Sequence, residues 1–174
     1  MRKRSITQSA QQPHPLAVEL GARFRERGLT LALAESCTGG LIGSLITDVP
    51  GSSDYFLGSA VTYAYSAKEA ILGVRRATLL AHGAVSAETA AEMAQGARRI
   101  FGADIAASVT GIAGPGGATP DKPTGLTYIH LSAAGAELGE RHVWGADRLG
   151  NKRLSAEAVL RLLIGYLQDG RTGE

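Results

Sequence analysis

A hydroxyl, a thiol and two glycines follow directly on a short apolar run near the start of the chain. The run is Leu-Ala-Leu-Ala over residues 31–34, and the turn after it reads Glu-Ser-Cys-Thr-Gly-Gly over residues 35–40. A buried strand that turns sharply into a helix leaves free backbone N–H groups at the carboxyl edge of a sheet, where ligands of open α/β folds bind. Ser36 is therefore a candidate nucleophile. The alternative is structural, with Thr38 or Ser36 as a helix N-cap.

A serine hydroxyl is a weak nucleophile until a base accepts its proton. The histidines offer no obvious base, because His14 lies in an N-terminal tail, His82 in a turn, and His130 and His142 in hairpin strands without a nearby carboxylate pattern. The G-x-S-x-G turn of α/β-hydrolases is absent. No paired Cys or His spacing indicates a metal site.

Tyr63 and Lys68 are the other candidates for proton transfer. Tyr63 ends a predicted strand and Lys68 begins the next helix, so both are expected at the same sheet edge as Ser36. A lysine that is partly desolvated becomes less basic and can accept a proton from a serine, while a neighbouring tyrosine can relay that proton or steady the lysine. The structural alternative is that Tyr63 fills the core and Lys68 is a solvated helix residue.

A glycine-rich segment over residues 111–117 is a candidate phosphate cradle, because glycine exposes backbone N–H groups. It matches neither the dinucleotide-binding nor the ATP-binding glycine pattern, and it leads into a strand instead of a helix.

Cys37 is a second possible nucleophile beside a helix N-terminus. A lone cysteine among small residues is more often simply buried.

The elements that position these residues follow from hydrophobic spacing and turn signals. Four apolar positions are expected to face inward in the last helix: Leu154, Ala158, Leu162 and Leu163. Strands are predicted over residues 31–34, 58–64, 104–110, 126–133 and 138–144. Helices are predicted over residues 16–28, 41–46, 79–83, 86–101 and 151–167, and a further short helix is predicted to begin at Ser66. Ser86 is the predicted N-cap of the helix that ends at residue 101. Strands and helices that alternate and then end in a hairpin and a helix predict an α/β fold, a three-layer α/β/α single domain with a mixed sheet.

Composition limits the classes of function. The chain has 174 residues and a net charge of +2, without a basic block that would favour nucleic acid. Residues 1–13 are predicted to be a disordered tail and residues 14–170 one domain. The single cysteine suits a reducing cytoplasm, and no apolar run predicts a signal peptide or a membrane span.

Several stretches together resemble the C-terminal domain of the CinA (competence/damage-inducible protein) family, from about Leu16 to Leu167. The first is the segment 34–40, and the second combines residues 62–63, Lys68 and residues 72–74. The third is the segment 83–86, and the fourth combines residues 110–117, residues 122–123 and Gly125. Two departures are Ala118, where a third glycine is usual, and the absence of a counterpart to the larger N-terminal domain of full-length members. Neither a pyrophosphatase activity nor a competence role is therefore transferred.

The stand-alone members of this family are nicotinamide-nucleotide amidohydrolases. The resemblance implies hydrolysis of the carboxamide of nicotinamide mononucleotide (NMN) to nicotinate mononucleotide and ammonia, in pyridine-nucleotide recycling, without a metal or organic cofactor. It assigns the nucleophile to Ser36 and its partners to Tyr63 and Lys68. It also implies substrate contacts by a larger set: Cys37, Thr38, Gly39, Gly40, Thr110, Gly111, Gly114, Gly116, Gly117, Arg148 and Arg153.

In this mechanism Ser36 attacks the amide carbon, backbone N–H groups of residues 37–40 hold the oxyanion, and Arg148 or Arg153 suits a phosphate. Two alternatives remain open, a nucleotide-binding module without catalysis and an amidase for another small amide. We further expect a homo-oligomer, with a dimer favoured, and no nucleic-acid or membrane partner.

Overall fold

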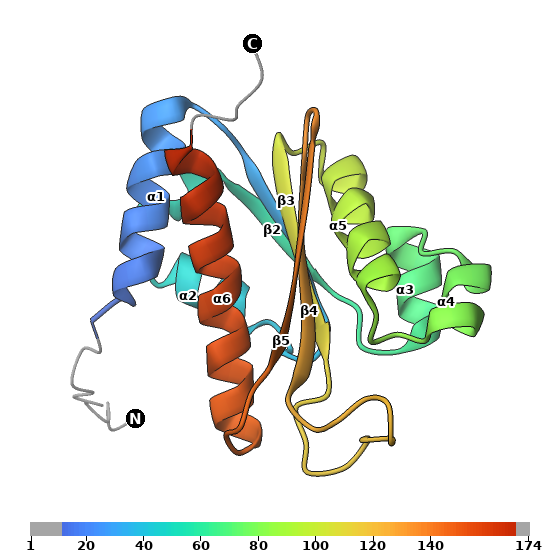
Figure 1. Cartoon of the computed structure of the whole chain (residues 1–174). Helices are drawn as coiled ribbons and strands as arrows, with labels where there is room; N and C mark the ends of the chain where they lie inside the picture. The colour runs from blue at the N-terminus through green and yellow to red at the C-terminus, as the bar shows by residue number, and fades with distance from the viewer. Residues whose placement is uncertain (1–11, 170–174) are drawn as a thin grey trace, which may run out of the picture.

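A five-stranded mixed sheet forms the centre of the computed structural model, which describes residues 12–169 (Figure 1). The strands are β1 (Leu31–Glu35), β2 (Phe56–Val61), β3 (Ile105–Gly111), β4 (Leu126–Ala133) and β5 (Ala136–Val143). Their order in the sheet is β2-β1-β3-β4-β5. β1 is parallel to both of its neighbours, whereas β4 is antiparallel to β3 and β5. The predicted mixed sheet is confirmed.

Helices cover both faces of the sheet, as Figure 1 shows. They are α1 (Pro15–Arg27), α2 (Leu41–Thr47), α3 (Tyr65–Leu72), α4 (Arg76–His82), α5 (Ala87–Phe101) and α6 (Arg148–Gln168), with a 3₁₀ turn η1 (Ser52–Asp54). α1, α2 and α6 pack on one face, and α5 packs on the other with α3 and α4 beside it. The three-layer α/β/α arrangement is therefore confirmed.

The position of β1 explains its sequence. It lies between β2 and β3 with helices on both faces, and all five of its residues are buried. A strand enclosed in this way has no solvent face, so its first four residues are apolar without alternation, and only the buried Glu35 at its end is charged. The edge strand β5, by contrast, has only exposed and half-buried residues.

Two boundaries differ from the prediction in ways that affect the site. β2 ends at Val61 instead of residue 64. The amide of Thr62 still donates to the carbonyl of Glu35 in β1, but the chain then leaves the sheet and turns into α3. α6 begins at Arg148 instead of residue 151, because the carboxylate of Asp147 accepts a hydrogen bond from the amide of Gly150 and caps the helix.

One inward position was predicted wrongly. Leu154 is 38% exposed, while Leu163 and Ala158 are buried as expected. The inward stripe of α6 follows Ala156, Val159 and Leu163, and Leu154 lies off this stripe.

Most of the predicted tail over residues 1–13 lies outside the described residues, and the domain bounds stay a prediction. Across residues 12–169, no helix has both the length and the apolar composition needed to cross a membrane.

Candidate active site

Ser36 and Lys68 meet at the carboxyl edge of the sheet. Ser36 directly follows β1, and Lys68 lies in α3 after the neighbouring strand β2. The Lys68 Nζ donates to the Ser36 Oγ at 2.9 Å and to the carbonyl oxygens of Thr62 at 2.7 Å and Tyr63 at 3.2 Å. The lysine is fully buried, so the alternative of a solvated helix residue is wrong. This arrangement places a candidate base in direct contact with the candidate nucleophile.

The environment of Lys68 makes its ammonium easier to deprotonate. Burial lowers its pKa from 10.5 to about 8, and the nearby Cys37 thiol opposes this shift. The three acceptors around Nζ are neutral oxygens, and within residues 12–169 the lysine forms no salt bridge with a carboxylate. The neutral amine is therefore accessible close to neutral pH, as a general base requires.

The buried carboxylate of Glu35 shapes the turn that carries Ser36. Its two oxygens accept hydrogen bonds from five groups: the Thr38 and Ser59 hydroxyls and the amides of Gly40, Ile42 and Gly43, at 2.7 to 3.1 Å. The amides at the start of α2 are thereby satisfied, and Gly40 occupies the N-cap position. Neither Ser36 nor Thr38 caps this helix. The Ser36 hydroxyl is therefore available for its hydrogen bond with Lys68.

The same bonds narrow the choice of oxyanion donors. The amide of Gly39 donates to the Ser36 carbonyl, and that of Gly40 donates to Glu35. Among residues 12–169, the amides of Cys37 and Thr38 donate to no backbone carbonyl and no carboxylate, and the Cys37 amide interacts only with its own thiol. Of the four expected donors, these two are therefore free to bind a substrate oxygen.

The environment of Cys37 does not favour the thiolate that nucleophilic attack requires. Its side chain is buried, and burial raises the pKa of its thiol to about 11. The reactive thiolate is consequently scarce at neutral pH.

Tyr63 contacts Lys68 through its backbone instead of its ring. Its side chain is 61% exposed, so it does not fill the core. Its hydroxyl accepts a hydrogen bond from the Arg148 Nη2 at 3.2 Å, and within the described residues it forms none with Ser36 or Lys68. A carbonyl that fixes Lys68 and a hydroxyl that holds Arg148 are the two functions this geometry supports.

The glycine-rich segment is attached to α6 and α4. Arg148 Nη1 donates to the Gly114 carbonyl at 2.6 Å, and Asn151 Nδ2 donates to the Ala113 carbonyl at 3.0 Å. On the other side, Lys122 Nζ donates to the carbonyl of His82 at the end of α4. A hollow of about 460 Å³ lies between the segment and α6, lined by residues 113–115, Thr124 and residues 146–149.

The other predicted contacts on the glycine-rich segment and α6 do not line this hollow. Gly116 and Gly117 are exposed on the outer part of the segment, and Gly111 is half-buried beside β4. The Thr110 hydroxyl donates to the carbonyl of Ala84 at 2.7 Å, so it anchors the loop before α5. Arg153 is exposed on α6.

Lys152 was not predicted, although it lies beside the nucleophile turn. Its Nζ is 3.8 Å from the point where a Cβ on Gly39 would stand. The missed signal was the four-residue spacing from Arg148, which places both cations on one face of a helix that begins at Arg148.

The histidines are paired with carboxylates, contrary to the prediction. His130 Nε2 lies 2.6 Å from a Glu137 oxygen because the hairpin brings β4 and β5 together, and His142 Nε2 lies 2.8 Å from an oxygen of Glu140 on the same strand, β5. Neither pair contains Ser36. Among residues 12–169, no three His, Cys, Asp or Glu side chains gather so that they could hold a metal ion.

Comparison with known proteins agrees with the sequence motifs. The family model described as the CinA C-terminal domain matches residues 13–167. CinA-like proteins from Chloroherpeton thalassium and Salinibacter ruber are 52% and 50% identical over 154 and 145 residues, which are 86% and 83% of this chain. These stretches are 36% and 35% of the relatives, so the chain spans about a third of the length of the curated relatives it matches.

Solved structures show the same fold. The competence/damage inducible protein CihA from Agrobacterium tumefaciens superposes with a TM-score of 0.86 at 37% identity, over 95% of this chain and 99% of that chain. A CinA superfamily protein from Klebsiella pneumoniae superposes with a TM-score of 0.87 at 29% identity, over 91% of this chain and 99% of that one.

Proposed function

The chain belongs to the CinA C-terminal domain family, and we propose that it is a serine amidohydrolase that converts NMN to nicotinate mononucleotide and ammonia. The observation that carries this proposal is the 2.9 Å hydrogen bond between the Nζ of a fully buried lysine, Lys68, and the Oγ of Ser36. A nucleotide-binding module without catalysis has no use for a lysine that is desolvated against a serine hydroxyl.

The proposed reaction has two steps. Neutral Lys68 accepts the Ser36 proton while Oγ attacks the carboxamide carbon, and the amides of Cys37 and Thr38 donate to the carbonyl oxygen as it gains negative charge. The Lys68 ammonium then returns the proton to the leaving nitrogen, and the C–N bond breaks to release ammonia. Water, deprotonated by Lys68, attacks the acyl-enzyme and releases the carboxylate and Ser36.

The charges around the site support an anionic substrate. Arg148 lines the hollow and Lys152 lies beside the turn, and neither of them has a carboxylate partner among residues 12–169. Unpaired cations at the mouth of a site attract a phosphate-bearing substrate. We also propose that the protein acts in the cytoplasm, where pyridine nucleotides are recycled, and as a homo-oligomer.

The decisive experiment measures ammonia release from NMN, nicotinamide riboside and free nicotinamide by the purified chain. We expect the highest kcat/KM for NMN. Equal values for NMN and nicotinamide would remove phosphate recognition from the proposal, and no release from any of the three would favour the binding module.

The Ser36→Ala variant tests the nucleophile. It should lose essentially all turnover, keep its circular dichroism spectrum and still bind NMN in a calorimetric titration. The matched control is Cys37→Ala, which should retain most of the activity because a thiol with a pKa of about 11 is not the nucleophile. An active Ser36→Ala enzyme would rule out the serine mechanism.

A further inference from the structure

The hydroxyl of Thr62 is a buried polar group without a partner. Thr62 is fully buried, and within residues 12–169 its Oγ1 forms no hydrogen bond. Among the described residues, the two other buried side-chain atoms of this kind belong to His14, before α1, and Tyr55, before β2. An unsatisfied buried hydroxyl costs stability, and valine has nearly the same shape without this cost. The threonine therefore indicates that its hydroxyl has a ligand.

Thr62 lies beside the nucleophile in the sheet. Glu35 of β1 is paired with Val61 of the parallel strand β2, so Ser36 and Thr62 occupy the next pair of neighbouring positions. The Glu35 carboxylate accepts amides of α2, and the Val61 side chain lies beside the N-cap of α2. Because successive side chains of a strand point to opposite faces, Ser36 and Thr62 face the other layer, which contains α3 and Lys68.

The polar groups on this side form one buried cluster. The Lys68 Nζ donates to the Ser36 Oγ at 2.9 Å and to the Thr62 carbonyl at 2.7 Å, whereas the Thr62 hydroxyl bonds directly to neither side chain. Buried polar groups that lie near one another without a direct bond are commonly bridged by water, which requires a few polar partners. The Thr62 hydroxyl, the Ser36 hydroxyl and the Lys68 amine supply such partners.

We propose that the Thr62 hydroxyl binds the water molecule that hydrolyses the acyl-enzyme at Ser36. The inference rests on the proposed function for the identity of the acyl group, and it makes Thr62 a water-positioning residue. The water donates one hydrogen bond to the Thr62 Oγ1 and the other to the neutral Lys68 Nζ. Its oxygen attacks the acyl carbon while Lys68 accepts its proton. The Lys68 ammonium then returns this proton to the Ser36 Oγ as the C–Oγ bond breaks, and the carboxylic acid formed releases its own proton to solvent.

The Thr62→Val variant tests the water site, because it removes the hydroxyl and keeps the shape of the side chain. The rate constant for hydrolysis of the acyl-enzyme, measured by intact-protein mass spectrometry after NMN is removed, should fall on the order of 100-fold, as for a misplaced reactant. The kcat/KM for ammonia release should stay near that of the wild type, since it reports acylation. The matched control is Thr62→Ser, which keeps a hydroxyl and should hydrolyse its acyl-enzyme at nearly the normal rate.

Urea unfolding distinguishes a water-positioning role from a structural one. Thr62→Val should unfold with no less free energy than the wild type, because it removes an unsatisfied buried group. A destabilised variant with normal acyl-enzyme hydrolysis would assign the hydroxyl to the fold and overturn the inference. A crystal structure of the wild type provides a test without a variant: a water molecule should bond both the Thr62 Oγ1 and the Lys68 Nζ, and a structure without it would also overturn the inference.

A second substrate, p-nitrophenyl acetate, separates the failure of this inference from the failure of the proposed function, because its acetyl group can reach Ser36 without a nucleotide. Acetylated Ser36 that persists in Thr62→Val and not in the wild type would support the water site even in a protein that releases no ammonia from NMN. Normal hydrolysis of both acyl groups by Thr62→Val would reject the water site and leave the proposed reaction intact.

Discussion

At the scale of single residues, the proposed chemistry depends on the protonation of Lys68. The amine is fully buried, and its pKa is lowered to about 8 because burial disfavours the charged form. An unperturbed lysine has a pKa of about 10.4 and would remain almost entirely protonated at neutral pH. The burial of the side chain is therefore what suits Lys68 to the base role that we propose.

The rate of hydrolysis should rise with pH through an ionisation near pH 8. Below this pH the protonated amine cannot accept the Ser36 proton, and above it the neutral amine can, so log kcat/KM should climb with a slope of one and then level off. The measurement is ammonia release from NMN across the pH range in which the fold is intact.

Variants of Lys68 separate a base from a fixed positive charge. Lys68→Met should fold and bind NMN but lose nearly all turnover. Lys68→Arg should be almost inactive as well, because a guanidinium keeps its proton at any working pH. An active Lys68→Arg enzyme would show that only the charge is required.

At the scale of elements, α2 is held by a carboxylate that comes from the strand before it. Glu35 ends β1, and its buried oxygens accept the amides of Gly40, Ile42 and Gly43 at the start of the helix. One side chain therefore satisfies the helix terminus and fixes the turn that carries Ser36.

Replacing Glu35 with Gln should cost both stability and activity. The amide group of glutamine would direct N–H groups at backbone N–H donors, so at least one buried donor would lose its acceptor, at a cost of about 1–3 kcal/mol. Urea unfolding measures the free energy, and ammonia release measures the activity. Glu157→Gln, on α6, is a control that should leave the free energy of unfolding nearly unchanged, since its contacts with His14 and Arg161 are long and partly exposed.

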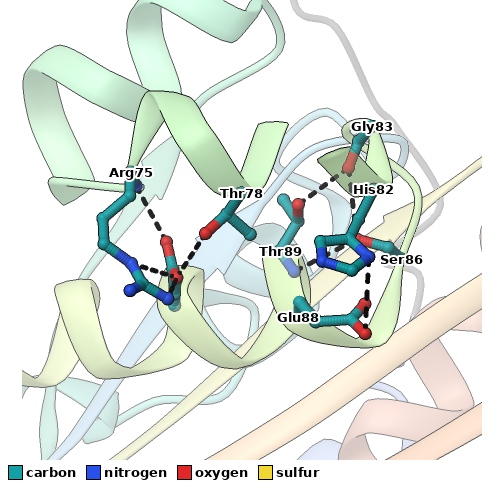
Figure 2. Close-up of polar contacts among 8 residues, drawn as sticks. Arg75, Thr78, His82, Gly83, Ser86, Glu88 and Thr89 are labelled. Atoms are coloured by element: carbon teal, nitrogen blue, oxygen red, sulfur yellow. Dashed lines mark hydrogen bonds and ion pairs between the residues drawn. The ribbon is translucent and has the colours of Figure 1, made fainter. Parts of the chain in front are cut away.

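The short helix α4 is fastened to α5 by Glu92. Its carboxylate accepts hydrogen bonds from the backbone and guanidinium of Arg75 and from the hydroxyl of Thr78. Figure 2 labels Arg75 and Thr78, together with the residues at the α5 N-terminus. At that terminus the Ser86 hydroxyl accepts from the Thr89 amide, as predicted for an N-cap, and the Thr89 hydroxyl donates to the Gly83 carbonyl.

Glu92→Gln should destabilise the fold by about 1 kcal/mol at neutral pH. The ion pair with the largely exposed Arg75 guanidinium contributes little because solvent screens it. Most of the stabilisation by Glu92 therefore comes from its hydrogen bonds with the Arg75 backbone and the Thr78 hydroxyl, which the substitution weakens. Although burial raises the pKa of Glu92, the hydrogen bonds from Arg75 and Thr78 lower it overall. The ionised carboxylate therefore stabilises the fold above the unfolded-state pKa of about 4.3, and this contribution is lost as the pH falls through the lower folded-state pKa. Chemical unfolding of both proteins at neutral and acidic pH should show the difference in free energy shrinking.

At the scale of the whole molecule, α6 connects the two ends of the site. Its first residues contact the glycine-rich segment through Arg148 and Asn151, Lys152 reaches the nucleophile turn, and its later residues form the core with α1 and α2. The buried Asn151 is central, because it donates to the Ala113 carbonyl and accepts the amide of Ala146.

Asn151→Leu should loosen the segment without removing a catalytic group. Two part-buried hydrogen bonds, one to the Ala113 carbonyl and one from the Ala146 amide, would be lost, so unfolding should require about 1 kcal/mol less free energy. The KM for NMN should rise more than kcat falls. Asn151→Asp keeps the acceptor for Ala146 and should lose only part of the effect, and a change confined to kcat would contradict this view of the segment.

The sequence alone determined the layers of the fold and the place of the nucleophile turn. Hydrophobic spacing and turn residues act over a few neighbouring positions, so they predicted five strands, the covering helices and the Ser86 cap. The turn of residues 35–40 is contiguous, which is why Ser36 could be proposed without a structure. Where the site depends on neighbours in the chain, the amino-acid order is sufficient.

Only the tertiary structure decided how distant side chains meet. Lys68 reaches Ser36 across 32 positions, and Arg148 reaches Tyr63 across 85. Lys152 lies beside the nucleophile turn because of where α6 begins, and the Tyr63 carbonyl contacts Lys68 because of where β2 ends. These contacts follow from how whole elements pack, and local propensity carries no information about the direction in which a side chain finally points.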